Sequence, residues 1–303
     1  MERIPFFVVG TAKAGTTSIA RSLNFNKQIA LASPKETWFF DGPGFEGEDP
    51  AERFVRKHIK SANLSNILAF GEVATSYLFV PYVAERIYTC FPNARIVIVL
   101  RDPVARAFSD WWMMYSSRIE KLSFKEAIEE NLLQIQRGIS FEGEKGKILW
   151  YDHLRSITEF KTLKYRTYID YGFYAPQISR YLKYFGKENV KIYFYEEIFK
   201  NPEGFFAPLE ELLCLPDNFF SRRFEVVNEK YNNRYIKILS GWLSKSYFLR
   251  SFASHVKLSS FFKNIGVTQA LDEGYAEKLR RLYDSDSVAL RDILDQTTPW
   301  PAS

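Results

Sequence analysis

The sequence predicts an α/β fold with a central parallel β-sheet and helices on both faces of that sheet. Three observations lead to this prediction. Two short apolar runs, 4–9 and 95–100, have the composition of strands buried on both faces. Each run leads directly into a segment with helical character. Strands then continue to alternate with helices along the chain, which is typical of parallel pairing.

The first unit is a strand at 4–9, a small polar loop at 10–17, and a helix that begins near Ser18 and reaches Leu23. The run RIVIVL at 95–100 is the clearest strand of the chain. Pro103 stands where the following helix should begin, because proline is favoured in a first helical turn. The remaining elements are predicted as strands at 67–72 and 190–195, and as helices at 81–90, 105–115, 176–184 and 203–213.

Two stretches, 140–164 and 228–234, have the weakest pattern of regular structure, and we expect loops or lids near a site there. The chain of 303 residues contains no internal repeat and no low-complexity linker, so a single domain over residues 1–303 is expected.

Composition limits the class of protein. Hydrophobic residues make up 46% and charged residues 25%, as in ordinary globular proteins. A net charge of +5 suits an anionic ligand but is too small to indicate nucleic acid. Two cysteines, Cys90 and Cys214, form neither a disulfide framework nor a metal-ligand spacing. With no signal peptide and no apolar run near the ~18 residues of a membrane span, a cytoplasmic protein is expected.

The loop Gly10-Thr11-Ala12-Lys13-Ala14-Gly15-Thr16-Thr17 is suited to binding a phosphate. It lies between a buried strand and a helix, where backbone N–H groups and the helix dipole favour an anion. Its glycines have the spacing of the G-x-x-x-x-G-K-[ST] loop of nucleotide hydrolases. However, Thr16 stands at the lysine position and Lys13 lies inside the loop, so a P-loop-like fold with a differently placed cation is predicted.

The residue after RIVIVL is the second discriminating feature. Nucleotide hydrolases hold Mg²⁺ with an aspartate from such a strand, whereas this chain has Arg101 there, followed by Asp102 and Pro103. An arginine suits a phosphate and repels a metal ion. Ser109, two helical turns later, could donate a hydroxyl to the same phosphate. We therefore expect a metal-free site for a nucleotide with two separate anionic ends.

Several segments resemble those of the sulfotransferases that use 3'-phosphoadenosine 5'-phosphosulfate (PAPS). FFVVGTAKAGTTSIARSL resembles their 5'-phosphosulfate loop, and RIVIVLRDPVARAFSDW resembles their 3'-phosphate strand and helix. SPKETWFFD and GEVATSYLFVPYVAERI are similar to the branch that contains heparan-sulfate and many bacterial enzymes. Later matches are YGFYAPQISRYLKYFGKENVKIYFYEEIFKNP and LRRLYDSDSVALRDIL.

The resemblance implies PAPS as co-substrate, with no metal. It assigns the 5' end to Lys13, Ala14, Gly15, Thr16, Thr17 and Ser18, and the 3'-phosphate to Arg101 and Ser109. It implies that the chain passes the nucleotide at Tyr171-Gly172. It also places a basic loop over the phosphates at Arg234, although Lys230 or Lys237 could serve instead.

Sulfonate transfer needs a cation for the leaving group and a base for the acceptor proton. Lys13 is the candidate cation, with a solvated surface lysine as the alternative. By resemblance Glu36 is the candidate base, and the alternative is an ion pair with Lys35 or Lys13. Glu72 is the second candidate base, or else a strand-end carboxylate that orients Lys13 or a loop amide.

Two positions depart from the heparan-type enzymes: Trp38 stands where they often have histidine, and Val73 where they have lysine. These changes favour a small molecule, a natural product or a lipid as acceptor, with a glycan as the alternative. Hydroxyl and amine acceptors both stay open. A nucleotide kinase and a catalytically silent nucleotide-binding module are the competing functions, and both are disfavoured by the residues above.

Other polar residues are assigned structural roles. The three histidines, His58, His153 and His255, share no motif, and His153 has the best claim to lie near an acceptor. Arg106 is expected on a solvated helix face. The segment 230–264 contains seven Lys or Arg and no Asp or Glu, with interleaved aromatic residues. A helical lid is expected there, with weak contact to a membrane surface or an acidic carrier protein as alternatives.

Overall fold

The computed structural model describes residues 3–60, 64–220, 224–225 and 271–300. Residues 1–226 together with 279–303 form one compact unit, and residues 227–278 form another. The predicted lid at 230–264, with Arg234 and His255, lies outside the described residues. The fold below is that of the first unit.

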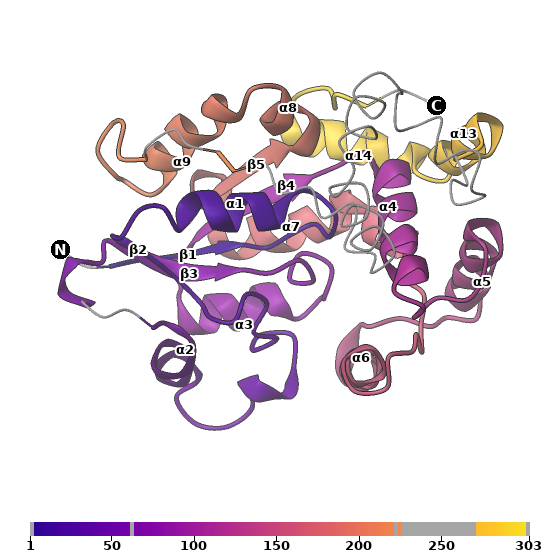
Figure 1. Cartoon of the computed structure of the whole chain (residues 1–303), viewed down its shortest axis with the longest axis horizontal. Helices are drawn as coiled ribbons and strands as arrows, with labels where there is room; N and C mark the ends of the chain where they lie inside the picture. The colour runs from indigo at the N-terminus through magenta and orange to yellow at the C-terminus, as the bar shows by residue number, and fades with distance from the viewer. Residues whose placement is uncertain (1–2, 61–63, 221–223, 226–270, 301–303) are drawn as a thin grey trace, which may run out of the picture. The chain divides into compact units, whose positions relative to one another are not determined.

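The first unit is built on one five-stranded sheet whose described pairings are all parallel. Its strands are β1 (Ile4–Val8), β2 (Ile29–Leu31), β3 (Ala69–Val73), β4 (Arg95–Leu100) and β5 (Val190–Phe194). Their order across the sheet is β2-β3-β1-β4-β5 (Figure 1). The predicted α/β class is confirmed, and β2 is a three-residue strand that the sequence analysis did not predict.

The strand order determines where a ligand can bind. From β1 the chain moves to β2 and β3 on one side, and then crosses to β4 on the other side. Phe6 is in register with Gly71 of β3 and with Arg95 of β4. The carboxyl ends of β1 and β4 are therefore neighbours at the point where the order reverses. In open parallel sheets, ligands bind at this switch point.

Alternating side chains of the central strands supply the two layers of the core. Phe7 and Ile96 face one layer, with residues of α2 (Pro50–His58), α3 (Val83–Cys90) and α7 (Tyr174–Phe185). Phe6 and Val97 face the other layer, with residues of α1 (Thr16–Leu23) and α9 (Phe206–Leu212). Figure 1 shows α1 and α3 on opposite faces of the sheet. The strands are buried on both sides, as their apolar composition predicts.

The remaining α-helices of the described chain are α4 (Pro103–Ser116), α5 (Phe124–Gln136), α6 (Gly143–Thr158), α8 (Tyr195–Lys200), α13 (Glu273–Arg281) and α14 (Asp284–Leu294). In the part of the chain that the structure describes, no helix is both long enough and apolar enough to span a bilayer.

The prediction of a loop at 140–164 is wrong, because α6 occupies most of that stretch. Its buried positions are Gly146, Trp150, His153 and Ser156, which recur at helical spacing. Trp150 packs against Phe141 and Phe79 in the core. Charged residues between these positions, Lys147 and Asp152, obscured the amphipathic pattern in the sequence.

The prediction that Arg106 lies on a solvated face is also wrong, since its side chain is fully buried in α4. The guanidinium donates to Asp110, one turn later, at 3.2 Å and to the carbonyl of Tyr168. It also lies over the ring of Tyr171, 5.2 Å from its centroid. Arg106 thus ties α4 to the 168–171 segment, a role that local sequence could not reveal.

Replacing Arg106 by alanine should therefore destabilise the fold by about 3–5 kcal/mol, because the buried Asp110 carboxylate would lose its cation. Urea denaturation followed by circular dichroism measures this change in the free energy of unfolding. Arg56→Ala, at an exposed position of α2, is the control and should change it by less than about 0.5 kcal/mol. Equal stability of the two variants would contradict the described contacts.

Candidate active site

Two turns, one after β1 and one after β4, meet at the carboxyl edge of the sheet. The backbone N–H of Thr11 donates to the Val99 carbonyl at 2.6 Å, and the N–H of Val99 donates to the Gly10 carbonyl at 2.8 Å. Beyond these ladder bonds, Nη1 of Arg101 donates to the Lys13 carbonyl at 2.7 Å. The structure therefore brings Lys13 and Arg101, the cations of the two predicted motifs, into direct contact through the loop backbone.

The loop at 10–17 turns sharply into α1. Lys13 and Gly15 have positive φ angles of 68° and 79°, a region that glycine occupies without strain. A Cβ atom on Gly15 would lie 2.5 Å from the ring of Phe199 in α8. Gly15 is the N-cap residue of α1, whose first turn contains no acidic residue. This arrangement suits an anion at the helix N-terminus.

The Lys13 ammonium lies against α4. Its Nζ is 3.2 Å from Sδ of Met113. A thioether is a weak, uncharged acceptor, so this contact leaves the positive charge of the lysine unneutralised. Among the ion pairs of the described residues, none involves Lys13. The geometry fits the predicted role of a cation that serves an anionic ligand.

Besides its hydrogen bond to the Lys13 carbonyl, Arg101 contacts two tyrosines. Its guanidinium lies 4.6 Å from the ring centroid of Tyr195, and its carbonyl accepts a hydrogen bond from the Tyr174 hydroxyl at 2.7 Å. The neighbouring Asp102 caps α4, since its carboxylate accepts a hydrogen bond from the Ala105 N–H at 2.7 Å. Ser109 is half-buried on α4, two turns further along. Arg101, directly after β4 as predicted, is therefore a packed and oriented residue.

The candidate base, Glu36, lies in the connection between β2 and α2. Its backbone is left-handed, with φ of 62°, and its carboxylate pairs with the Lys35 ammonium. The Glu36 side chain is 27% exposed, and the neighbouring Trp38 is 41% exposed. The predicted pairing with Lys35 is therefore present, and the carboxylate remains accessible from solvent.

Glu72, the other candidate base, is fully buried at the end of β3. One carboxylate oxygen accepts from the Thr37 N–H at 2.5 Å, and the other accepts from the Tyr77 hydroxyl at 2.7 Å. Burial raises the pKa of Glu72 to about 7. The structure thus realises the predicted alternative in which this carboxylate orients a loop amide. That amide directly follows Glu36.

Gly172 is packed tightly at the position where the nucleotide was expected. A Cβ atom there would lie 2.7 Å from the ring and hydroxyl of Tyr283. The preceding Tyr171 stacks on Phe79 with ring centroids 4.0 Å apart. Close packing alone therefore accounts for the glycine, and a contact of Gly172 with nucleotide stays a prediction.

Two histidines are structural. His153 is buried, and its Nδ1 accepts from the Tyr165 N–H at 3.4 Å. Burial among aromatic rings lowers the pKa of His153 to about 4, so it is neutral at physiological pH. His58 is likewise buried, packed against Phe39 and Phe54. Both imidazoles are therefore packed among aromatic side chains and buried from solvent.

Several residues that shape the site do not stand out in the sequence. Met113 and Tyr195 contact the two cations, yet neither belongs to a polar motif that would reveal it. Tyr77 lies within the quoted segment GEVATSYL, five residues after Glu72. Its hydroxyl could have been suspected, because buried tyrosines bond to a polar partner.

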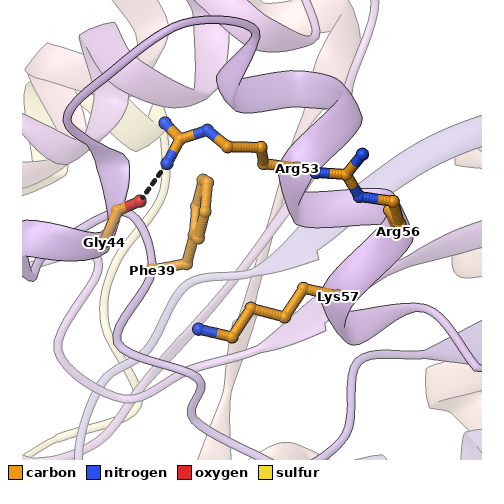
Figure 2. Close-up of a pocket in the computed structure, with 5 residues that line it drawn as sticks. All are labelled: Phe39, Gly44, Arg53, Arg56 and Lys57. Atoms are coloured by element: carbon orange, nitrogen blue, oxygen red, sulfur yellow. Dashed lines mark hydrogen bonds between the residues drawn. The ribbon is translucent and has the colours of Figure 1, made fainter.

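A separate hollow of about 450 Å³ lies beside α2, lined by Phe39, Gly44, Arg53, Arg56 and Lys57 (Figure 2). The Arg53 guanidinium lies near the Phe39 ring and donates to the carbonyls of Gly44 at 3.1 Å and Phe45 at 2.8 Å. Arg53 thus braces the connection that follows Glu36. None of the predicted site residues lines this hollow.

Comparison with known proteins identifies a family. A family model described as "Sulfotransferase domain" matches residues 3–283 of the chain. "Membrane-associated sulfotransferase kil1" of Dictyostelium discoideum is 33% identical over 131 residues, which are 41% of this chain and 27% of that protein. "Heparan sulfate glucosamine 3-O-sulfotransferase 5" of Mus musculus is 25% identical over 214 residues, 69% of this chain and 53% of that protein.

The chain therefore aligns with about a quarter to a half of the length of these relatives. Among solved structures, a sulfotransferase from Alicyclobacillus acidocaldarius has a TM-score of 0.63 at 24% identity. The alignment covers 98% of both chains. This similarity supports the fold described above.

The contact between Lys13 and Met113 leads to a prediction about anion binding. Met113→Glu should weaken the binding of adenosine 3',5'-bisphosphate roughly 10-fold, because a carboxylate beside the ammonium would compete with the ligand for its charge. Isothermal titration calorimetry measures the affinity. Met113→Leu keeps the volume and should bind within about 2-fold of the native protein. Met114→Glu, at the next position of α4, is the charge control. An unchanged affinity in Met113→Glu would show that Lys13 does not face the ligand.

Proposed function

Because the chain belongs to the sulfotransferase family, we propose that it transfers a sulfonate group from PAPS to a hydroxyl or amine of an acceptor. One observation carries this proposal: the Lys13 loop and Arg101 lie together at the switch point of the sheet, joined by the bond from Arg101 to the Lys13 carbonyl. Two adjacent cationic turns suit a nucleotide that is anionic at both ends of its ribose.

In the proposed reaction the acceptor oxygen or nitrogen attacks the sulfur of PAPS. A bond forms between the acceptor atom and sulfur while the bond from sulfur to the bridging oxygen of the 5'-phosphate breaks. Negative charge grows on that oxygen, and the Lys13 ammonium stabilises it. Amides of the 10–17 loop and the start of α1 orient the 5' end. Adenosine 3',5'-bisphosphate leaves with the electron pair.

The acceptor proton is transferred to Glu36. Its partial exposure supports this assignment, because an acceptor must reach the base from solvent. Glu72 is the less suitable base, since it is fully buried and both of its oxygens already accept hydrogen bonds. Arg101 and Ser109 are assigned to the 3'-phosphate, and no metal ion takes part in this scheme.

The acceptor that we favour has an apolar or aromatic surface, as in a small natural product or a lipid. Exposed Trp38, two residues after Glu36 in the chain, offers a flat ring to such a surface. Position 73 is occupied by an uncharged valine that is buried in the core, so it supplies no cation for an anionic acceptor. A glycan is the second candidate, favoured by the heparan sulfate activity named for the mouse relative. A screen of phenolic, lipid and oligosaccharide acceptors with ³⁵S-labelled PAPS distinguishes the two.

Lys13→Met should lower kcat roughly 100-fold or more, since the charge on the leaving oxygen would lose its stabilising cation. The rate is measured as label transfer from PAPS in the presence of EDTA. Lys125→Met, at an exposed position of α5, should leave the rate unchanged. Activity in Lys13→Met equal to that of the native enzyme would contradict the proposed mechanism.

Glu36→Gln should lower kcat for a hydroxyl acceptor roughly 100-fold, within the usual contribution of a general base. The KM for PAPS should change little, because Glu36 is assigned to the acceptor. Steady-state kinetics separates the two constants, and Glu85→Gln on an exposed face of α3 serves as the control. A large rise in the KM for PAPS at unchanged kcat would assign Glu36 to the nucleotide instead.

A further inference from the structure

We propose that residues 72–78 form a rigid bridge that sets the spacing between the Lys13 loop and Glu36, with Glu72 and Tyr77 acting as positioning residues. The inference rests on the proposed function, since it concerns how that site is assembled. It assigns Glu72 and Tyr77 a role in which neither touches a reacting atom.

Glu72 and Tyr77 of the bridge bind the backbone that follows Glu36. Glu72 accepts from the Thr37 N–H at 2.5 Å, and Tyr77 donates to the same carboxylate at 2.7 Å. The Tyr77 hydroxyl also accepts from the Phe40 N–H at 3.4 Å. Two amides on either side of Trp38 are therefore bound by one buried pair of side chains.

The rest of this connection is held by arginines from other helices. Arg86 of α3 donates to the carbonyls of Phe40 at 2.9 Å and Gly42 at 3.3 Å. Arg53 of α2 holds three further carbonyls, those of Gly44, Phe45 and Glu48. The segment near Glu36 itself lacks such an arginine among its described contacts. Its backbone is held instead by Glu72 and Tyr77, together with the bond from the Phe39 N–H to the Thr37 hydroxyl at 3.2 Å.

Other residues of the bridge bind the end of β1, which leads into the Lys13 loop. The N–H of Ala74 donates to the Val8 carbonyl at 2.9 Å, and the N–H of Leu78 donates to the Val9 carbonyl at 2.6 Å. A Cβ atom on Gly10 would lie 3.0 Å from the Thr75 carbonyl oxygen, so the two backbones touch. The Lys13 loop thus begins at a point fixed to the bridge.

A third contact prevents the bridge from moving as a whole. The Tyr181 hydroxyl of α7 donates to the Tyr77 carbonyl at 2.7 Å, and both tyrosines are fully buried. The residues that hold the Glu36 segment, 72 and 77, alternate along the chain with those that hold the end of β1, 74 and 78. A displacement of Tyr77 would therefore change the distance between the donor loop and the base. Errors of this kind are costly, because a shift of ~1 Å can reduce the rate of an enzyme about 100-fold.

The charge state of Glu72 should affect this grip. The ionised carboxylate is the stronger acceptor for the Thr37 amide, and burial raises its pKa to about 7. The titratable groups around it are Asp41, which accepts from Ser76 and is itself buried, and the Tyr77 hydroxyl. As the pH falls through about 7, Glu72 gains a proton and the bond to Thr37 weakens. The native enzyme should then lose kcat on the acidic side of about pH 7.

The test compares Glu72→Gln and Tyr77→Phe with matched controls, Glu129→Gln on an exposed face of α5 and Tyr88→Phe on α3. Both bridge variants should lower kcat roughly 10- to 100-fold. Calorimetric affinity for adenosine 3',5'-bisphosphate should stay within about 2-fold. In addition, Glu72→Gln should lose the decline of kcat near pH 7, because its amide does not titrate. The controls should retain native kcat and the native pH profile.

Three outcomes overturn the inference. Native kcat in both bridge variants would show that the spacing does not depend on these residues. An equal loss of nucleotide affinity would indicate general destabilisation, and a profile in Glu72→Gln that still declines near pH 7 would assign that decline to another group. If Glu72→Gln does not fold, Tyr77→Phe alone decides, since it removes one hydroxyl. Absence of sulfonate transfer by the native protein would instead refute the proposed function.

Discussion

The hydrogen bond from the Arg101 guanidinium to the Lys13 carbonyl is the contact on which the proposed site depends. It joins the turn after β1 to the turn after β4, and those turns are neighbours because the strand order reverses between them. The Tyr195 ring and the Tyr174 hydroxyl hold Arg101 from α8 and α7. Two cations that are 88 positions apart in the chain are thereby kept at one edge of the sheet.

A second set of contacts holds the proposed acceptor side on the same sheet. The connection that carries Glu36 is held through backbone groups by buried Glu72 and Tyr77 and by Arg86 and Arg53. Backbone groups exist whatever side chains a loop carries. The exposed side chain of Trp38 is not part of these contacts, so we expect its replacement to leave the proposed base in position.

Local pattern was sufficient where structure is determined locally. RIVIVL is a strand with the predicted bounds, and the small polar loop leads into a helix that begins at Thr16, two residues before the predicted start. Prediction failed where tertiary contacts decide: β2 has only three residues, and α6 is recognisable only once Trp150 is known to be buried. Arginine is usually a surface residue, yet Arg106 is buried because Asp110 and the Tyr168 carbonyl accept its hydrogen bonds. The motif residues Lys13 and Arg101 were predicted, whereas their mutual contact required the fold.

The most direct test of this account is a calorimetric comparison of adenosine 3',5'-bisphosphate with adenosine 5'-monophosphate, under identical salt. Two cationic turns that hold opposite ends of one nucleoside should bind the bisphosphate at least about 10-fold more tightly, since the second phosphate adds charge-assisted hydrogen bonds. That preference should fall in Arg101→Ala. Equal affinity for the two nucleotides would mean that the protein binds only one end of the nucleotide. It would contradict a site built from both the Lys13 turn and the Arg101 turn.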